Sequence, residues 1–150
     1  MNIIIIMNNL KDTESNCLFC KIVSGKVAAA TVVEEEKILS FMDIQQSQPG
    51  HVLIIPRKHY NNFSEIPLEI GSSMMILCHK MAKAIYNSFN PQGITIYLSD
   101  GEAAGQVIPH VHLHLQPRAK GDDLLNIKET KTSETKELLI LAEQLKAEVY

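Results

Sequence analysis

Three histidines alternate with apolar residues in the segment His110-Val111-His112-Leu113-His114-Leu115-Gln116. Because successive side chains of a β-strand point to opposite faces, an extended conformation puts the three imidazoles on one face and the apolar side chains on the other. Neighbouring imidazoles would then lie roughly 6–7 Å apart, twice the rise per residue. Such an array suits two chemistries: a metal ion bound by imidazoles, or a nucleophilic imidazole with others beside it.

A second group of residues with possible chemistry lies near the start of the chain. Cys17 and Cys20 form a Cys-x-x-Cys pair, which has the spacing of half a zinc site. A thioredoxin-like redox pair would need a βαβ setting, and the sequence pattern does not predict one. Two interpretations stay open from the residues alone: two zinc ligands, or two reduced thiols without a metal.

Length and composition limit the class of protein. The chain has 150 residues, of which 45% are hydrophobic and 21% charged, so one folded domain is expected. The formal net charge of −3 gives no bulk attraction to nucleic acid or to an anionic membrane. The apolar stretch Met1–Met7 is too short to span a bilayer and lacks a basic leader, so we expect a disordered start or an added edge strand. An odd number of cysteines, three, favours a reducing compartment, and we expect the cytoplasm.

The elements that must position these residues follow from periodicity. Short apolar runs predict strands at 31–34, 38–42, 51–55 and 94–98, with the histidine segment 110–116 as a fifth. A long helix is predicted from Pro67 to the break at Asn90, and a last amphipathic helix carries Leu138, Leu141, Ala142 and Leu145. Strands on both sides of one long helix predict an α+β fold with a largely antiparallel five-stranded sheet. We expect an N-terminal extension at 1–15, the main domain at 16–118, and a linker with the C-terminal helix at 119–150.

The alternating histidine segment resembles the signature of the histidine triad (HIT) family, His-x-His-x-His-x-x with apolar x. Four further segments resemble the same family in its order and spacing, so that the resemblance runs from Cys17 to Arg118: Cys17–Gly25, Phe41–Ile44, Pro49–Pro56 and Asp100–Gln106. The resemblance is to bacterial-type members in particular.

This resemblance implies a nucleotide hydrolase or transferase. The expected reaction cleaves the bond at the α-phosphate of nucleoside phosphoramidates or dinucleoside polyphosphates, with AMP or GMP conjugates as substrates. His112 would attack the phosphorus and form a covalent nucleotidyl-histidine, with its other N–H held by a backbone carbonyl at His110. No metal is expected in the chemical step. The resemblance also implies a homodimer, and neither nucleic acid nor a membrane is an expected partner.

The resemblance also assigns the other site residues. His114, His51 and Gln106 would join His112 in catalysis. The expected substrate-binding residues are grouped by the part of the nucleotide they contact: Phe19, Ile22, Phe41 and Ile44 at the base, Asp43 at the ribose, and Ser99, Gly105 and Gln106 near the phosphate. Two positions depart from the family. It often has Asn where this chain has Ser99, and Ser or Thr where this chain has Val107, so the resemblance does not determine which leaving group is preferred.

Some bacterial members of this family bind a structural zinc ion, and the positions that match its ligands here are Cys17, Cys20, His59 and His110. Two other functions remain open. One is a zinc hydrolase in which His110, His112 and His114 bind a catalytic metal, and the other is a nucleotide-binding or scaffold protein with little turnover.

Overall fold

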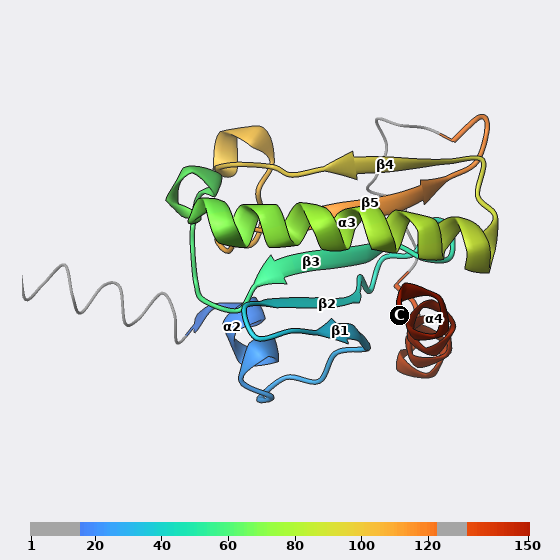
Figure 1. Ribbon diagram of the computed structural model, residues 1–150, viewed down its shortest axis with the longest axis horizontal. Coiled ribbons are helices and arrows are strands. Elements are labelled where there is room, and N and C mark those ends of the chain that lie inside the picture. The colour runs from blue at the N-terminus through green and yellow to red at the C-terminus, as the bar shows by residue number, and fades with distance from the viewer. Residues whose placement is uncertain (1–15, 123–131) are drawn as a thin grey trace, which may run out of the picture.

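A computed structural model describes residues 16–122 and 132–150 of the chain, so the segment Met1–Met7 lies outside the described residues. Five strands form one sheet in the order β1-β2-β3-β5-β4, and all four neighbouring pairs are antiparallel (Figure 1). The strands are β1 (Thr31–Glu34), β2 (Ile38–Met42), β3 (Val52–Pro56), β4 (Gly93–Tyr97) and β5 (Leu113–Arg118). The predicted α+β class and the five-stranded antiparallel sheet are therefore confirmed.

Three helices and two 3₁₀ turns complete the described chain: α2 (Leu18–Val23), η1 (Phe63–Glu65), α3 (Leu68–Phe89), η2 (Glu102–Ala104) and α4 (Thr135–Val149). Helix α3 begins directly after Pro67 and ends at Asn90, which donates its N–H to the Tyr86 carbonyl at 3.0 Å and turns the chain out of the helix with a left-handed φ of 45°. The predicted limits of this helix are confirmed. None of the helices in residues 16–122 and 132–150 has the length and apolar character needed to cross a membrane.

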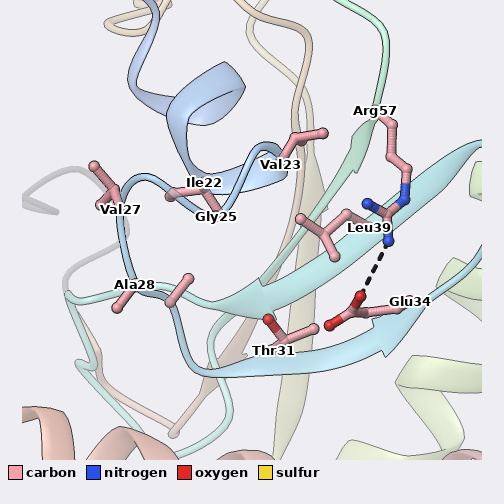
Figure 2. A pocket seen from close by; sticks show the side chains of 10 residues that line it. Ile22, Val23, Gly25, Val27, Ala28, Thr31, Glu34, Leu39 and Arg57 are labelled. Atoms are coloured by element: carbon pink, nitrogen blue, oxygen red, sulfur yellow. Dashed lines mark hydrogen bonds and ion pairs between the residues drawn. The ribbon is translucent and has the colours of Figure 1, made fainter.

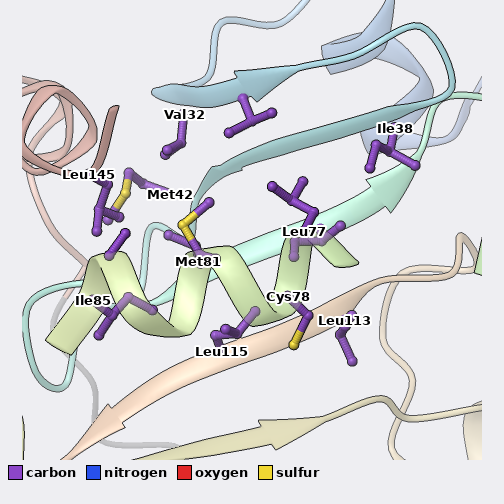
Figure 3. Close-up of a cluster of buried hydrophobic side chains, with 14 of the residues drawn as sticks. Val32, Ile38, Met42, Leu77, Cys78, Met81, Ile85, Leu113, Leu115 and Leu145 are labelled. Atoms are coloured by element: carbon purple, nitrogen blue, oxygen red, sulfur yellow. The ribbon is translucent and has the colours of Figure 1, made fainter. Parts of the chain in front are cut away.

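The sheet is apolar on both faces, and the two faces have different partners. One face packs against α3 and α4 and forms the main core, where Cys78 of α3 lies beside Leu113 and Leu115 of β5 (Figure 3). The other face forms a smaller cluster beneath α2, made of Cys17, Phe19, Leu39, Phe41, Leu53 and Ile55. The register pairs Phe41 with Leu53 and Leu53 with His114. The histidine face is thus the face that α2 covers.

The histidine strand is shorter than predicted, because β5 begins at Leu113 and leaves His110 and His112 before it. The last pairs at this end are Leu113 with Ile54 of β3 and His114 with Tyr97 of β4, so residues 110–112 pair with neither strand, although β3 runs on to Pro56. The Val111 N–H instead donates to the Tyr60 carbonyl at 2.8 Å. The predicted alternation of faces still holds, since Val111 is in the main core while His110 and His112 contact Phe19 on the opposite face.

Candidate active site and metal cluster

His112 is held in one tautomer by the backbone. Its Nδ1–H donates to the carbonyl oxygen of His110 at 2.6 Å, and the side chain is 94% buried, with 6% exposed. Burial lowers the pKa of His112 below its ordinary value, more than its backbone hydrogen bond and Asp43 raise it. The ring is therefore neutral at pH 7, and its lone pair is on Nε2. The carbonyl at His110 is the acceptor that the family resemblance implied.

His114 and His51 form a hydrogen-bonded pair beside His112. The Nδ1–H of His51 donates to the Gln45 carbonyl at 2.8 Å, which directs Nε2 of the same ring toward His114. This Nε2 accepts from Nδ1–H of His114 at 3.0 Å. Burial, with smaller contributions from His51 and His112, lowers the pKa of His114 to about 3. His114 is thus neutral at pH 7.

The carboxylate of Asp43 lies against this pair. Its Oδ1 accepts from the backbone N–H of Gln45 at 2.8 Å, and its Oδ2 lies 3.6 Å from Nε2 of His51 and 4.0 Å from Nδ1 of His114. The peptide groups of one residue, Gln45, therefore orient both Asp43 and His51. The carboxylate keeps 16% of its surface exposed, so one edge of the site is open to solvent.

Aromatic rings enclose the histidines. Tyr97 stacks on His114 with ring centroids 4.3 Å apart and an interplanar angle of 5°. Phe19 meets His112 edge to face at 5.1 Å and Phe41 at 5.5 Å. The ring centroids of His112 and His114 are 4.9 Å apart at an interplanar angle of 60°, closer than the roughly 6–7 Å predicted from the rise of a strand.

The loop before the histidine segment is fixed by Gln106. Its Oε1 accepts from the Gly101 N–H at 2.7 Å, and its Nε2 donates to the Asn61 carbonyl at 2.9 Å. Gly105 has a φ of +91°, a conformation that L side chains rarely adopt. Ser99 Oγ lies 3.9 Å from the position a Cβ at Gly105 would take. Both ends of the Gln106 amide thus bind protein, and its contact with a phosphate stays a prediction.

The four residues expected at the base are not equally accessible. Phe19 and Phe41 are buried, Ile22 is partly buried, and Ile44 is 57% exposed. Beside Ile22, a hollow of about 250 Å³ opens between α2 and β1, and Arg57 and Glu34 form an ion pair at its edge at 3.2 Å (Figure 2). None of the histidines lines this hollow.

The predicted zinc ligands converge on one point. Cys17 Sγ and Cys20 Sγ lie 3.4 and 3.6 Å from Nδ1 of His110, and Cys20 Sγ lies 3.2 Å from Nδ1 of His59. Sulfur and nitrogen ligands on a tetrahedral zinc ion, at about 2.3 and 2.05 Å, are about 3.6 Å apart. All three cysteines lie in the described chain, and none is in a disulfide. These four side chains could therefore hold a metal ion.

The hydrogen bonds of Nε2 in both histidines of this cluster also fit a metal site. Nε2–H of His110 donates to the Pro56 carbonyl at 2.8 Å, and Nε2–H of His59 donates to Oδ1 of Asn61 at 3.1 Å. In both rings Nε2 thus binds an oxygen acceptor while Nδ1 faces sulfur. Metal-binding histidines ordinarily donate their other N–H to such acceptors.

The three imidazoles of the triad do not share one ligand point. Within residues 16–122 and 132–150, two groups of three or more side chains lie close enough to bind one metal ion. The first consists of Cys17, Cys20, His59 and His110, and the second consists of Asp43, His51 and His114. Neither group contains His112. The zinc hydrolase with His110, His112 and His114 as ligands therefore has no support in this geometry.

Sequence reasoning missed four residues that support the site: Gln45, Pro56, Asn61 and Tyr97. Gln45 and Pro56 act through backbone atoms, which leave no signal in side-chain chemistry. Tyr97 lies opposite His114 in the register of β4 and β5, so knowledge of the strand pairing would have found it.

Comparison with known proteins agrees with this site. Residues 24–121 match the model of the HIT domain family. The chain is 42% identical over 108 residues to Protein hit of Bacillus subtilis, covering 71% of this chain and 74% of that protein. It is 34% identical over 110 residues to adenosine 5'-monophosphoramidase HNT1 of Candida albicans, covering 71% and 72%.

A solved structure gives the same fold. The crystal structure of a Zn-bound histidine triad family protein from Mycobacterium smegmatis is similar at a TM-score of 0.78 and 31% identity, covering 91% of this chain and 94% of that one. Sequence match, fold and the arrangement of the histidines agree. The chain belongs to the histidine triad family.

Proposed function

We propose that this protein is a nucleotide hydrolase in which His112 is the nucleophile. The observation that carries the proposal is the hydrogen bond from His112 Nδ1–H to the His110 carbonyl, because it fixes the tautomer whose Nε2 lone pair can attack. Burial, which keeps the ring unprotonated at neutral pH, supports the same role.

The reaction has two displacements at phosphorus. Nε2 of His112 attacks the α-phosphorus, and the bond to the leaving group breaks with its electron pair going to that group, which takes up a proton. Water then attacks the nucleotidyl-imidazole, the P–N bond breaks, and the neutral ring and a nucleoside monophosphate are released. Splitting one difficult displacement into two easier ones is the general advantage of covalent catalysis.

The other residues bind and position the substrate in this proposal. Asp43 would accept hydrogen bonds from the ribose hydroxyls, and His114 would lie beside the phosphate, next to His112. The backbone at Gly105 would approach the phosphoryl oxygens, while Phe19, Ile22, Phe41 and Ile44 contact the base. The monophosphoramidase from Candida albicans, a relative, supports AMP conjugates as the substrate class, with GMP conjugates as the related purine alternative.

We also propose that the cluster of Cys17, Cys20, His59 and His110 binds a structural zinc ion. The ligand distances, the acceptors on both histidines and the zinc-bound relative from Mycobacterium smegmatis support this assignment. All four positions are filled by protein, so the ion takes no part in the chemical step. Thiolate ligands require a reducing compartment, and we place the protein in the cytoplasm.

A homodimer is the proposed assembly. Strand β4 is at the edge of the sheet, and its Ile96 is 46% exposed. Edge strands with free peptide groups pair readily with a second copy of the same strand. Light scattering coupled to gel filtration would test this, and a monomer at micromolar protein would contradict it.

The experiment that tests the nucleophile is rapid quenching followed by intact mass measurement. The protein is mixed with adenosine phosphoramidate or a diadenosine polyphosphate, and one adenylyl adduct is expected, mapping to His112 and absent from His112→Ala. His79→Ala is the matched control, because His79 is exposed on α3. An adduct on another residue contradicts the mechanism, and binding without release of AMP would favour a nucleotide-binding protein instead.

A further inference from the structure

Three atoms that could serve as metal ligands converge at the edge of the proposed active site, outside the cysteine cluster. They are Nε2 of His51, Nδ1 of His114 and Oδ2 of Asp43, separated by 3.0, 3.6 and 4.0 Å. His51 is 3% exposed, and the side chains of His114 and Asp43 are 13% and 16% exposed, so the point where they meet is enclosed but reachable from solvent.

The separations suit a metal ion. Nitrogen and oxygen ligands at about 2.1 Å from a tetrahedral zinc ion are about 3.4 Å apart, and the three measured distances fall on both sides of that value. Two imidazoles with one carboxylate leave at least one position open for water or another ligand. Imidazole-rich sites of this kind prefer zinc and its neighbours in the first transition row to magnesium or calcium.

The supporting hydrogen bonds are already in place. The Gln45 carbonyl holds Nδ1–H of His51 at 2.8 Å, which directs Nε2 to the shared point. The Gln45 N–H binds Oδ1 of Asp43 at 2.8 Å and leaves Oδ2 for the same point. Outer hydrogen bonds that orient ligands in this way are typical of built metal sites. Two of the three ligands are thus oriented by one peptide segment before any ion arrives.

We propose that Asp43, His51 and His114 form a second, weaker site for a divalent transition-metal ion such as Zn²⁺. Binding requires the proton on Nδ1 of His114 to move to Nε2 of the same ring, because Nδ1 becomes a ligand. The hydrogen bond between the two imidazoles is then replaced by two bonds to the ion. An ion in this site occupies the carboxylate and imidazole that the proposed function assigns to ribose and phosphate, so it excludes the nucleotide.

The metal site can be tested apart from the proposed activity. Protein carrying one equivalent of Zn²⁺ in the cysteine cluster is titrated with Co²⁺, followed by calorimetry and visible absorption. A second equivalent is expected, with d–d bands but without the thiolate-to-cobalt band that a cysteine site gives. Zn²⁺ binding to the same protein should shift the ¹⁵N resonances of Nε2 of His51 and Nδ1 of His114.

Asp43→Asn is the decisive variant. Asparagine keeps an oxygen for the Gln45 N–H and replaces the ligand oxygen with an NH₂ group, so the fold should be unchanged and the second equivalent should bind at least tenfold more weakly. Glu137→Gln on α4, the same chemical change at an exposed position, should bind as the unmodified protein does. Equal affinity in Asp43→Asn, a thiolate band with the second equivalent, or no second equivalent at millimolar metal would each overturn the proposal.

A separate competition experiment with AMP tests whether Asp43 and His114 bind the nucleotide. AMP should displace the second equivalent and leave the first in place. If the second equivalent binds as described but AMP does not displace it, the metal site stands and the assignment of Asp43 and His114 to the nucleotide fails. The two proposals can therefore fail independently.

Discussion

Removal of zinc from the cysteine cluster should lower the stability of the whole fold by a calculable amount. The four ligands come from three separate segments: Cys17 and Cys20 at α2, His59 after β3, and His110 before β5. Cys17 and His110 are 93 residues apart in the chain, so the unfolded protein has no preformed tetrahedral site. Zinc should therefore bind the native state almost exclusively.

The magnitude follows from mass action. A ligand that binds only the native state adds about 2.7 kcal/mol to the free energy of unfolding at one hundred times its Kd. Each further tenfold increase in free zinc adds about 1.4 kcal/mol. These increments are a large part of the roughly 5–15 kcal/mol that ordinarily stabilises a domain.

The assay is urea unfolding followed by circular dichroism in buffers of fixed free zinc, kept low enough to leave the Asp43–His51–His114 site empty. The unmodified protein should gain stability in proportion to the logarithm of free zinc, whereas Cys17→Ser/Cys20→Ser should not respond. Cys78→Ser is the control. Because Cys78 is buried in the main core, this variant should be less stable at every zinc concentration but should gain stability with free zinc as steeply as the unmodified protein does. A flat profile in the unmodified protein, or the same slope in the double variant, would refute the reasoning.

Three further predictions concern individual side chains. Gly50→Ala should lower the free energy of unfolding by more than about 2 kcal/mol, because the φ of Gly50 is +105° and a Cβ there would lie 2.6 Å from Phe89. Gly25→Ala is the control and should lower it by only about 1 kcal/mol, because Gly25 has a φ of +76° but open space around it. Equal losses of stability in urea unfolding would contradict the steric argument. Ser40→Ala should leave stability unchanged or raise it by up to about 1 kcal/mol, because the Ser40 hydroxyl is buried without a hydrogen-bond partner; a clear loss of stability would show a hidden partner. Burial raises the pKa of the Cys78 thiol, so iodoacetamide at pH 8 should label it only after unfolding, and mass mapping that finds labelled Cys78 in the native protein would refute this.

Much of the fold could be predicted because its elements follow local patterns. Strands β1 and β2 have the predicted limits, and β3 and β4 are displaced by a single residue. The start of β5 was wrong, since alternation of residue types cannot tell whether a segment hydrogen-bonds to a neighbouring strand. Residues 110–112 pair with neither β3 nor β4; the Val111 N–H binds the Tyr60 carbonyl, and the His110 carbonyl accepts from His112.

The site could be predicted only in part for a related reason. Side-chain types and motif order identified the cysteine cluster and the histidines, and the structure brings these together. The hydrogen bonds of the Gln106 amide to Gly101 and Asn61 could not be predicted, because only the three-dimensional loop brings those groups beside it; its expected contact with a phosphate stays a prediction. The support from Gln45 comes through its peptide group, which every residue possesses, so no sequence pattern could indicate it.

The last helix, α4, lies beyond the residues that the family model matches. That match ends at residue 121, whereas α4 places Leu138, Leu141 and Leu145 in the main core, at most 9% exposed. Burial of three leucines contributes roughly 5–9 kcal/mol. A polypeptide ending at Gly121 would thus retain every residue proposed for chemistry and lose an amount of stability comparable to a typical domain total. The residues that the family model recognises are thus fewer than the residues that stabilise this fold.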